Sequence, residues 1–358
     1  MTSLFDPISL RGLTIRNRIF LPPMCMYRVE AKDGVPTDWH LAHYGSRAAG
    51  GFGLVVAEAT GVSPEGRITP WCCGIWNDEQ AGAWERIAAL AHQEGAAFAI
   101  QLQHAGRKGS FYRDFDVPAS GSVPLSDGGW ETIGPSPIPF PGIAAPRAAS
   151  LDDIAKVRAD FVAAAKRADA AGVDAVQLHA AHGYLLFEFL SPLSNQRTDQ
   201  YGGSFEGRTR LLLEVAEDVR EVWPDNKPLL VRLSATEWVD GGWTVEESVE
   251  LARLLKDRGV DMIDVSSGGN VLAPIPKDVD YQIPLAAAVR KAGLPVSAVG
   301  RITEARQAQS ILDEGLADAV SVGRAALRDP HWPLRTGAEL GVPRDNLPYS
   351  KSYLRGRF

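Results

Sequence analysis

The stretch VDAVQLHAAHGY, residues 173–184, decides the fold. Its first half is an apolar, partly β-branched run that predicts a buried strand, and this strand ends where two histidines and a tyrosine follow. Two imidazoles and a phenol at the end of a strand can hold a polarised oxygen and deliver a proton. Because two isolated histidines are more often hydrogen-bonded core residues, the rest of the chain must decide between these interpretations.

Seven further short apolar runs alternate with amphipathic helical stretches. Near-continuous apolar strands between helices predict a parallel sheet that is buried on both faces. Eight such units favour a single (β/α)₈ TIM barrel over residues 1–358, with the site at the C-terminal strand ends. A doubly wound sheet is the second candidate, but no G-x-G-x-x-G motif opens a helix. The expected strands are 18–22, 53–59, 98–103, 173–179, 228–233, 262–266, 295–299 and 319–323, and the expected helices include 81–93, 151–171, 208–223, 245–258 and 304–314.

One long segment after the third expected strand, residues 107–150, interrupts this alternation. It is rich in Gly, Pro and Ser and has few periodic apolar positions. Loops of this length are uncommon unless they form lids or binding loops. On a barrel the segment would cap the mouth of the active site, so we expect a lid. A surface insertion without consequence is the alternative.

Composition narrows the class of protein. The 358 residues are 45% hydrophobic and 23% charged, which suits a globular chain with a full core. A net charge of -7 argues against a nucleic-acid or anionic-membrane surface. No run approaches the roughly 20 apolar residues of a membrane span, and the first residues lack the pattern of a secretory signal. Three cysteines, two of them adjacent, give no disulfide framework, so a reducing cytoplasm is the expected compartment.

Glycine followed by arginine stands at the ends of the last two expected strands, as Gly300-Arg301 and Gly323-Arg324. Glycine permits close backbone approach, and a guanidinium binds anions well. Phosphate sites in barrels commonly lie after strands seven and eight, and Ser267-Gly268 follows strand six at the same edge. This pattern predicts a phosphorylated ligand.

Gln101 and Arg232, near the ends of the third and fifth strands, suit the planar part of such a ligand. They could supply an amide and a fixed positive charge to a ring that becomes anionic on reduction. That pattern favours flavin mononucleotide (FMN) over a sugar phosphate. The alternative for Arg232 is an ion pair inside the barrel.

A series of motifs, in this order, resembles the old yellow enzyme family of FMN-dependent ene-reductases, and in particular its bacterial branch. The resemblance runs from Leu4 almost to the C-terminus, and residues 191–204 are its most specific part. The motifs are Asn17-Arg18-Ile19, Pro22-Pro23-Met24-Cys25, Glu58-Ala59-Thr60, Gln101 to Lys108, His179 to Leu185, Ser191 to Asp199, Tyr201 to Ser204, and Val322-Gly323-Arg324.

The resemblance implies an NAD(P)H-dependent oxidoreductase that reduces the activated C=C bond of α,β-unsaturated carbonyl or nitro compounds. His179 and His182 would bind the substrate oxygen, as an oxyanion hole does. Flavin N5 would give hydride to the β-carbon, Tyr184 would protonate the α-carbon, and Tyr27 would line the substrate pocket. The implied FMN contacts are Pro23, Met24, Cys25, Ala59, Gln101 and Arg232 at the ring, and Ser267, Gly268, Gly300, Arg301, Gly323 and Arg324 toward the phosphate.

The hydride donor has no separate site in the sequence, because no dinucleotide fingerprint occurs. NADPH or NADH would therefore bind over the flavin, where the substrate also binds, which predicts ping-pong kinetics. Arg107 and Lys108 could help to hold this donor.

Cys25 and the C-terminal segment add two expectations, one about the branch of the family and one about the oligomer. Cys25 is typical of the bacterial branch, where its thiol would tune the flavin rather than act as a nucleophile. Alone it would be taken for a buried structural cysteine, as Cys72 and Cys73 are. The terminal Tyr-x-Arg-Gly pattern at Tyr353 implies a homo-oligomer in which Arg355 contacts the substrate in the neighbouring subunit. A solvated tail is the alternative.

Two rival functions remain open. A metal-dependent hydrolase on the same barrel would use His179 and His182 as ligands, with His104 as the third. It leaves the two Gly-Arg pairs unexplained, and no H-E-x-x-H motif occurs. A non-catalytic flavin-binding sensor would share every flavin contact but would have no use for an acid at Tyr184.

Overall fold

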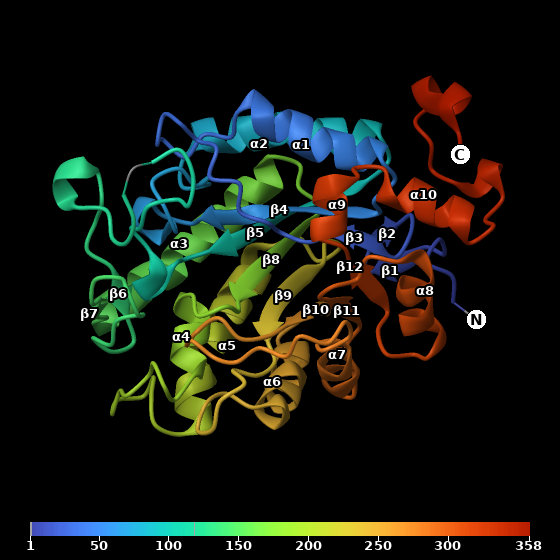
Figure 1. The fold of residues 1–358 in the computed structure, drawn as a ribbon. Coiled ribbons are helices and arrows are strands. Elements are labelled where there is room, and N and C mark those ends of the chain that lie inside the picture. Colours follow the sequence, from blue (N-terminus) through green and yellow to red (C-terminus); the bar gives the residue numbers. More distant parts are fainter. Residues whose placement is uncertain (1, 118) are drawn as a thin grey trace.

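The computed structural model describes residues 2–117 and 119–358, and a closed barrel of eight parallel strands forms its centre (Figure 1). The strands follow one another around the barrel in chain order, and β12 pairs with β3 to close it. The predicted barrel is confirmed, and the doubly wound sheet is wrong. The predicted strand ends differ from the observed ones by at most two residues. The barrel strands are β3 (Ile19–Leu21), β4 (Leu54–Gly61), β5 (Ala97–Gln103), β8 (Ala175–Ala180), β9 (Leu229–Ser234), β10 (Met262–Ser266), β11 (Val296–Val299) and β12 (Ala319–Ser321).

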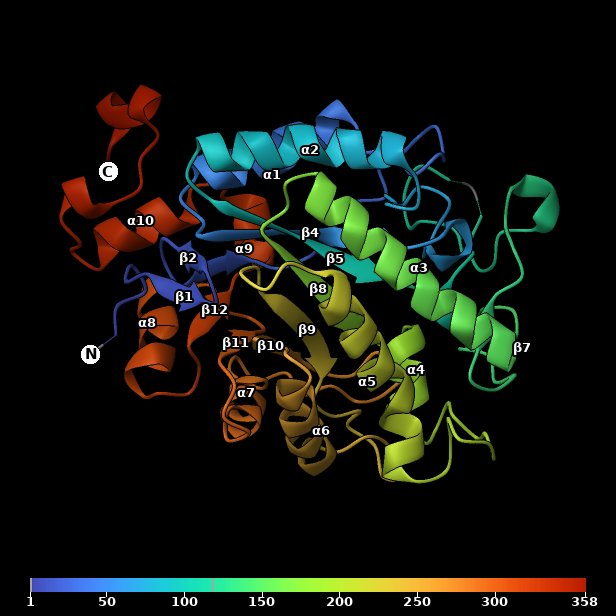
Figure 2. The ribbon, with the colours of Figure 1, turned by 180° about the vertical axis from the view of Figure 1, so that it is seen from behind.

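Helices surround the barrel on its outer face (Figure 2). The five predicted helices are present as α2, α3, α5, α6 and α8, and four of them begin at a side-chain cap, for example Ser150 of α3 and Thr244 of α6. Five further helices were not predicted. The helices are α1 (Asp38–Ala49), α2 (Asp78–Gln93), α3 (Leu151–Ala170), α4 (Leu185–Leu190), α5 (Phe205–Val222), α6 (Val245–Asp257), α7 (Ile283–Arg290), α8 (Ala305–Asp313), α9 (Arg324–Arg328) and α10 (Trp332–Glu339). No helix in the described ranges is long and apolar enough to cross a membrane.

The inside of the barrel changes from apolar to polar along the strands. On β8, Ala175 belongs to an inner apolar cluster, and Gln177 and His179 follow at every second position. On β9, Leu230 of the same cluster is followed by Arg232. Because alternate strand residues point to the same side, these polar side chains share the interior with the apolar ones. The C-terminal ends of the strands therefore open into a polar site.

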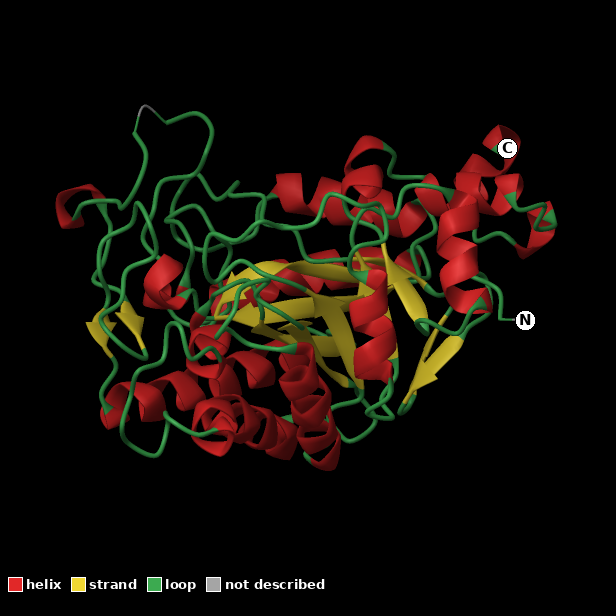
Figure 3. Cartoon of the chain, turned by 60° about the horizontal axis from the view of Figure 1, so that its bottom comes forward, coloured by secondary structure: helices red, strands yellow, loops and turns green. Residues whose placement is uncertain are grey.

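Two small sheets lie at opposite ends of the barrel. The hairpin of β1 (Ile8–Leu10) and β2 (Leu13–Ile15) packs into the inner apolar cluster and so closes the N-terminal end. At the other end, β6 (Ile133–Gly134) and β7 (Arg147–Ala148) pair within the long segment 107–150. Figure 3 shows this segment as a loop-rich region beyond the C-terminal ends of the barrel strands. Residue 118, which belongs to the predicted lid, lies outside the described residues.

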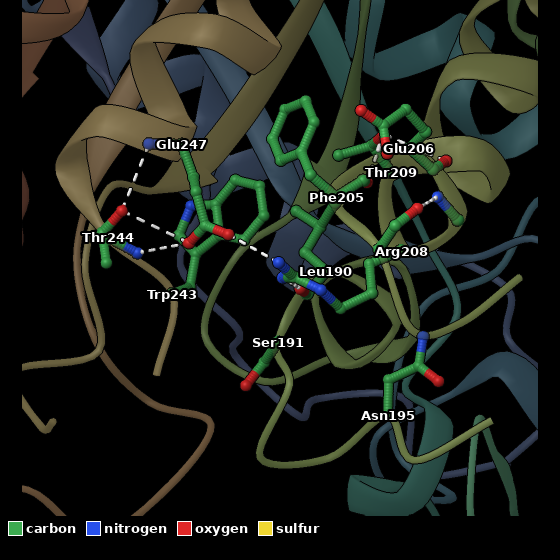
Figure 4. A network of polar contacts seen from close by, with 12 residues as sticks. Leu190, Ser191, Asn195, Phe205, Glu206, Arg208, Thr209, Trp243, Thr244 and Glu247 are labelled. Atoms are coloured by element: carbon green, nitrogen blue, oxygen red, sulfur yellow. Dashed lines mark hydrogen bonds and ion pairs between the residues drawn. The ribbon is translucent and has the colours of Figure 1, made fainter. Parts of the chain in front are cut away.

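A buried arginine, Arg208, links α4, α5 and α6 through its hydrogen bonds (Figure 4). Arg208 of α5 donates hydrogen bonds to the carbonyl oxygen of Leu190 at the end of α4 and to Glu247 of α6, the latter at 2.6 Å. Its guanidinium also lies over the Trp243 ring, 5.6 Å from the centroid. Since α4 begins directly after Tyr184, this anchor fixes the helix that carries the tyrosine.

Candidate active site

The two histidines and the tyrosine predicted from the sequence meet at the end of β8. The His179 ring lies between the others, with centroids 5.2 Å from His182 and 4.9 Å from Tyr184. The Nδ1 atom of His179 accepts the Ala181 N–H at 3.3 Å. A backbone N–H can only donate, so a neutral His179 carries its proton on Nε2. This ring therefore presents an N–H donor to the site.

Burial keeps these three groups in their uncharged forms. It lowers the pKa of His179 and His182 well below the usual value, and the positive charge of Arg232 lowers both pKa values further. Burial also raises the pKa of Tyr184 well above its usual value, and nearby Cys25 adds to the shift. At neutral pH the site thus offers two neutral imidazoles and a protonated phenol.

The loop that carries His182 is held by its neighbours from three sides. Its backbone N–H donates to Ser234 Oγ at 2.9 Å, and its Nε2 lies 2.7 Å from Ser266 Oγ. Lys108 Nζ donates to the carbonyl oxygens of His182 and Gly269, each at 2.9 Å. Burial lowers the pKa of this lysine to about 8. The ammonium also lies over the Tyr184 ring, 5.0 Å from its centroid, so it links the histidine loop to the tyrosine.

Backbone packing around this loop demands glycine. Gly183 has a φ of 71°, and a Cβ there would lie 2.4 Å from Asn270 Cα. A Cβ on Gly269, with a φ of 94°, would lie 2.7 Å from His182 Cα. His182 itself adopts a φ of 58°, which is uncommon for a residue with a side chain. The loops after β8 and β10 therefore touch backbone to backbone, which sets the direction of His182.

A cavity of about 300 Å³ extends from His182 toward the ends of β11 and β12. Eight of the twelve predicted cofactor residues line it: Pro23, Met24, Arg232, Ser267, Gly300, Arg301, Gly323 and Arg324. The cavity wall also contains residues that the sequence reasoning did not name as contacts, namely Pro22, Ser266, Tyr281, Gln282, Val299, Ile302, Thr303 and Ser321.

The far end of this cavity is suited to an anion. The Arg301 and Arg324 side chains both line it, and no carboxylate does. Gly300 has a φ of 117°, and a Cβ there would lie 2.4 Å from Gln282 Nε2. Gln282 in turn bridges Ser267 Oγ, which donates to it at 2.6 Å, and the Val299 carbonyl at 2.8 Å. Two guanidinium groups beside glycine backbone match the phosphate of a mononucleotide.

The remaining predicted residues lie around the other end of the site. Cys25, Tyr27 and Tyr184 pack against a small apolar cluster that contains Ala59. Gln101 of β5 donates to Gln177 of β8 at 2.7 Å, inside the barrel. Gly268 does not line the cavity, although its neighbour Ser267 does. Burial raises the pKa of Cys25 well above the usual value, so this residue is a thiol at neutral pH.

The sequence left open whether Arg232 contacts the ligand or forms an ion pair inside the barrel, and its side chain is placed for both. Its Nε lies 3.1 Å from Asp264 Oδ2 in a buried ion pair, and its Nη1 donates to the Pro23 carbonyl at 3.2 Å. The same side chain lines the cavity. Arg232 therefore forms the ion pair inside the barrel and still lines the cavity.

Arg107 and Lys108, predicted to help hold the hydride donor, are engaged with the protein instead. Arg107 is buried, and its Nη2 donates to the backbone oxygen and the Oδ1 of Asn270 at 2.6 and 2.8 Å. Its backbone N–H donates to Glu188 Oε1 at 2.8 Å, and burial raises the pKa of Glu188 to about 8. These contacts attach the start of the predicted lid to α4 and to the loop after β10.

The C-terminal segment lies away from this cavity. Arg355 is exposed and is not among the cavity-lining residues. Figure 1 places the C-terminus beside α10, at the end of the molecule opposite β6 and β7. Any contact of Arg355 with a substrate would therefore involve the site of another subunit.

The rival metal site is not assembled. Within the described ranges, the group of three potential ligand side chains that come within 4.8 Å of one another is His40, Glu58 and Cys73. It contains none of the three histidines proposed as ligands. The His104 Nδ1 instead accepts the Gly106 N–H at 3.1 Å. In the buried group, His40 Nδ1 accepts the Thr37 N–H at 3.0 Å, so a neutral His40 carries its proton on the Nε2 that a metal would need.

The chain is similar to known proteins over most of its length. Residues 3–341 match the model of the NADH:flavin oxidoreductase / NADH oxidase family. An NADPH dehydrogenase of Geobacillus thermodenitrificans is 46% identical over 343 residues, which cover 95% of each chain. The structure of the old yellow enzyme homologue from Zymomonas mobilis is similar with a TM-score of 0.79 at 32% identity, covering 96% of this chain and 94% of the other. Morphinone reductase in complex with tetrahydroNAD gives a TM-score of 0.78 at 30% identity, covering 96% and 92%.

The protonation state of the histidine pair gives a direct test of the site. We expect His179 and His182 to remain neutral from pH 8 to pH 6, because a lowered pKa favours the uncharged base throughout this range. His92 is the internal control, since its hydrogen bond with Asp174 raises its pKa and it should gain a proton on acidification. Ring-nitrogen NMR, with signals assigned from single histidine variants, measures this. A second ring proton on His179 or His182 above pH 6 would contradict the predicted burial effect.

Proposed function

The chain belongs to the NADH:flavin oxidoreductase / NADH oxidase family and within it to the old yellow enzymes, and we propose that it reduces activated C=C bonds. It is an FMN-dependent oxidoreductase that uses NADPH or NADH. The proposed substrates are α,β-unsaturated carbonyl or nitro compounds. One observation carries this proposal: two neutral histidines and a protonated tyrosine lie together beside a cavity whose far end holds two arginines.

The residues of the cavity fit FMN. Arg301 and Arg324, with the backbone of Gly300 and Gly323, would hold the phosphate. Pro23, Met24 and Arg232 line the same cavity as His182, so the flavin ring would lie against them, and Cys25, Ala59 and Gln101 would complete its surroundings. When bound, FMN supplies a two-electron carrier that NAD(P)H reduces and the substrate reoxidises.

The protein groups would then act on the substrate. The Nε2–H of His179 and one ring nitrogen of His182 would donate hydrogen bonds to the carbonyl or nitro oxygen. These bonds strengthen as negative charge develops on that oxygen, so they lower the barrier to reduction. Tyr184 would deliver the proton to the α-carbon, and its raised pKa keeps that proton available at neutral pH. Tyr27 would line the same pocket.

The hydride donor and the substrate would bind one after the other in the same pocket beside His179 and His182. The chain has no dinucleotide fingerprint, and Lys108 already donates to two backbone carbonyls beneath the histidine loop. We therefore propose ping-pong kinetics, with segment 107–150 as a lid over the shared pocket. Lys108 would contact the bound hydride donor only through the third N–H of its ammonium group.

We also propose a homo-oligomer in which the C-terminal segment contributes to a neighbouring site. Tyr353, Leu354 and Phe358 are exposed apolar residues on either side of Arg355. Exposed apolar side chains of this kind are typical of a surface that a partner covers. Arg355 would then approach the substrate of the adjacent subunit.

The visible spectrum of the purified protein tests the function in one anaerobic experiment. A flavin band should bleach on addition of NADPH and return on addition of 2-cyclohexenone. A band that bleaches and does not return would favour the flavin-binding sensor. Protein that stays colourless after incubation with FMN would contradict the proposal altogether.

Tyr184→Phe tests the proton donor. We expect reoxidation by a weakly activated enone to slow about 100-fold, because general acids typically contribute 10²–10⁴ in rate. Flavin reduction by NADPH should change less than about threefold, since that step takes no proton from Tyr184. Stopped-flow measurement of the two half-reactions separates these effects. Tyr201→Phe is the control, because it removes a hydroxyl that bonds Glu214 away from the site. Equal slowing of both half-reactions would exclude the role.

Arg324→Ala tests the phosphate end. We expect FMN affinity to fall about tenfold or more, since charge-assisted hydrogen bonds to phosphate are strong. Fluorescence titration of apoprotein with FMN measures the affinity. Arg328→Ala is the matched control, because Arg328 lies on the same short helix, is exposed and does not line the cavity. Unchanged affinity in Arg324→Ala would remove this residue from the phosphate site.

A further inference from the structure

Four polar side chains stand at one level of the barrel wall. The strand register pairs His179 of β8 with Arg232 of β9, Arg232 with Asp264 of β10, and Asp264 with Ser297 of β11. All four residues are buried. The proposed function uses His179 and Arg232, whereas Asp264 and Ser297 have no part in it so far.

Asp264 is placed to act on Arg232. One of its oxygens, Oδ2, lies 3.1 Å from Arg232 Nε, and the other accepts the Ser297 hydroxyl at 2.8 Å. The carboxylate is therefore held from both sides. On Arg232, Nη1 donates to the Pro23 carbonyl, whereas Nε and the facing Asp264 Oδ2 have no hydrogen-bond partner within the described part of the chain, so their contact is an ion pair without hydrogen-bond geometry. The ion pair thus holds a buried carboxylate beside the guanidinium of Arg232, which also lines the cavity.

We propose that Asp264 is a positioning residue for Arg232 and that its charge lowers the reduction potential of bound FMN. This inference rests on the proposed position of Arg232 beside the flavin ring. A flavin ring that accepts two electrons gains negative charge, which the guanidinium stabilises. The nearby carboxylate offsets part of that stabilisation. Since buried charges interact through an effective dielectric constant of about 20 rather than 80, removal of one carboxylate should be measurable at the ring.

The test compares the reduction potentials of FMN-loaded wild-type protein and Asp264→Asn. Each is equilibrated anaerobically at pH 7 with a redox dye of known potential, and the flavin spectrum is read. At a fixed dye potential we expect the ratio of reduced to oxidised flavin to rise about tenfold in Asp264→Asn, which is about 30 mV for two electrons. A rise of less than about threefold overturns the inference.

Further variants separate charge from structure. Asp264→Glu restores the carboxylate and should return the ratio to within about threefold of the wild type. Ser297→Ala removes the hydroxyl that donates a hydrogen bond to Asp264 but keeps the carboxylate. The ratio of reduced to oxidised flavin should therefore stay within about threefold of the wild type. Asp257→Asn, an exposed carboxylate at the end of α6, should have no effect. A shift in Ser297→Ala as large as that in Asp264→Asn would assign the effect to local packing and overturn the charge argument.

A second variant decides the matter if Asp264→Asn does not fold or retains no FMN. Asp264→Ser removes the same carboxylate with a smaller side chain, so the ratio of reduced to oxidised flavin should rise at least threefold. An unchanged ratio there contradicts the inference. If the wild-type protein carries FMN and the variants have the same flavin reduction potential as the wild type, only this inference is refuted. If the wild-type protein binds no FMN, the proposed function is refuted as well.

Discussion

The closure of eight parallel strands into one barrel is the constraint on which the site depends. Closure gives every strand an inner and an outer face, and it brings the C-terminal ends of all eight to one rim. Polar side chains on the inner face near that rim cannot reach bulk water, so they must satisfy one another. The Gln101–Gln177 and Ser297–Asp264 hydrogen bonds do so across neighbouring strands, and Arg232 and Asp264 balance each other's charge, although Arg232 Nε and Asp264 Oδ2 make no hydrogen bond. The barrel can thus carry buried charge at its rim over an apolar interior.

The direction of the reactive side chains comes from the loops above this rim. Lys108 joins the backbone of His182 to that of Gly269, and Arg208 holds the far end of the helix that follows Tyr184. These contacts come from the loop after β5 and from α5, elements that the site residues do not belong to. The histidine pair therefore depends on side chains from elements other than its own strand and loop. This division between reacting groups and the groups that hold them is typical of a preorganised site.

Much of the fold could be predicted from the sequence because buried parallel strands are near-continuous apolar runs, and all eight were found for that reason. Helix α1 was missed because the face that it buries carries His40, His43, Tyr44 and Arg47 in place of aliphatic residues. The residues after each strand could be assigned to one site because parallel strands end at the same rim. The partners of those residues could not. That Asp264 lies opposite Arg232 depends on the strand register, and Gln282 reaches the cavity from the start of α7, a short helix that has no capping signal.

The segment between β5 and α3 is joined to the loop after β3 by an arginine. Arg113 donates to the Tyr27 carbonyl at 2.8 Å and makes a two-point ion pair with Glu30, while Tyr27 holds a left-handed φ of 54°. The insertion and the loop after β3 therefore form one mechanical unit, although more than eighty residues separate them in the chain. In evolutionary terms the two cannot drift independently. As this lineage diversifies, a change at Arg113 should be accompanied by one at Glu30, and each such pair of changes would alter the backbone at Tyr27, the residue that we propose lines the substrate pocket.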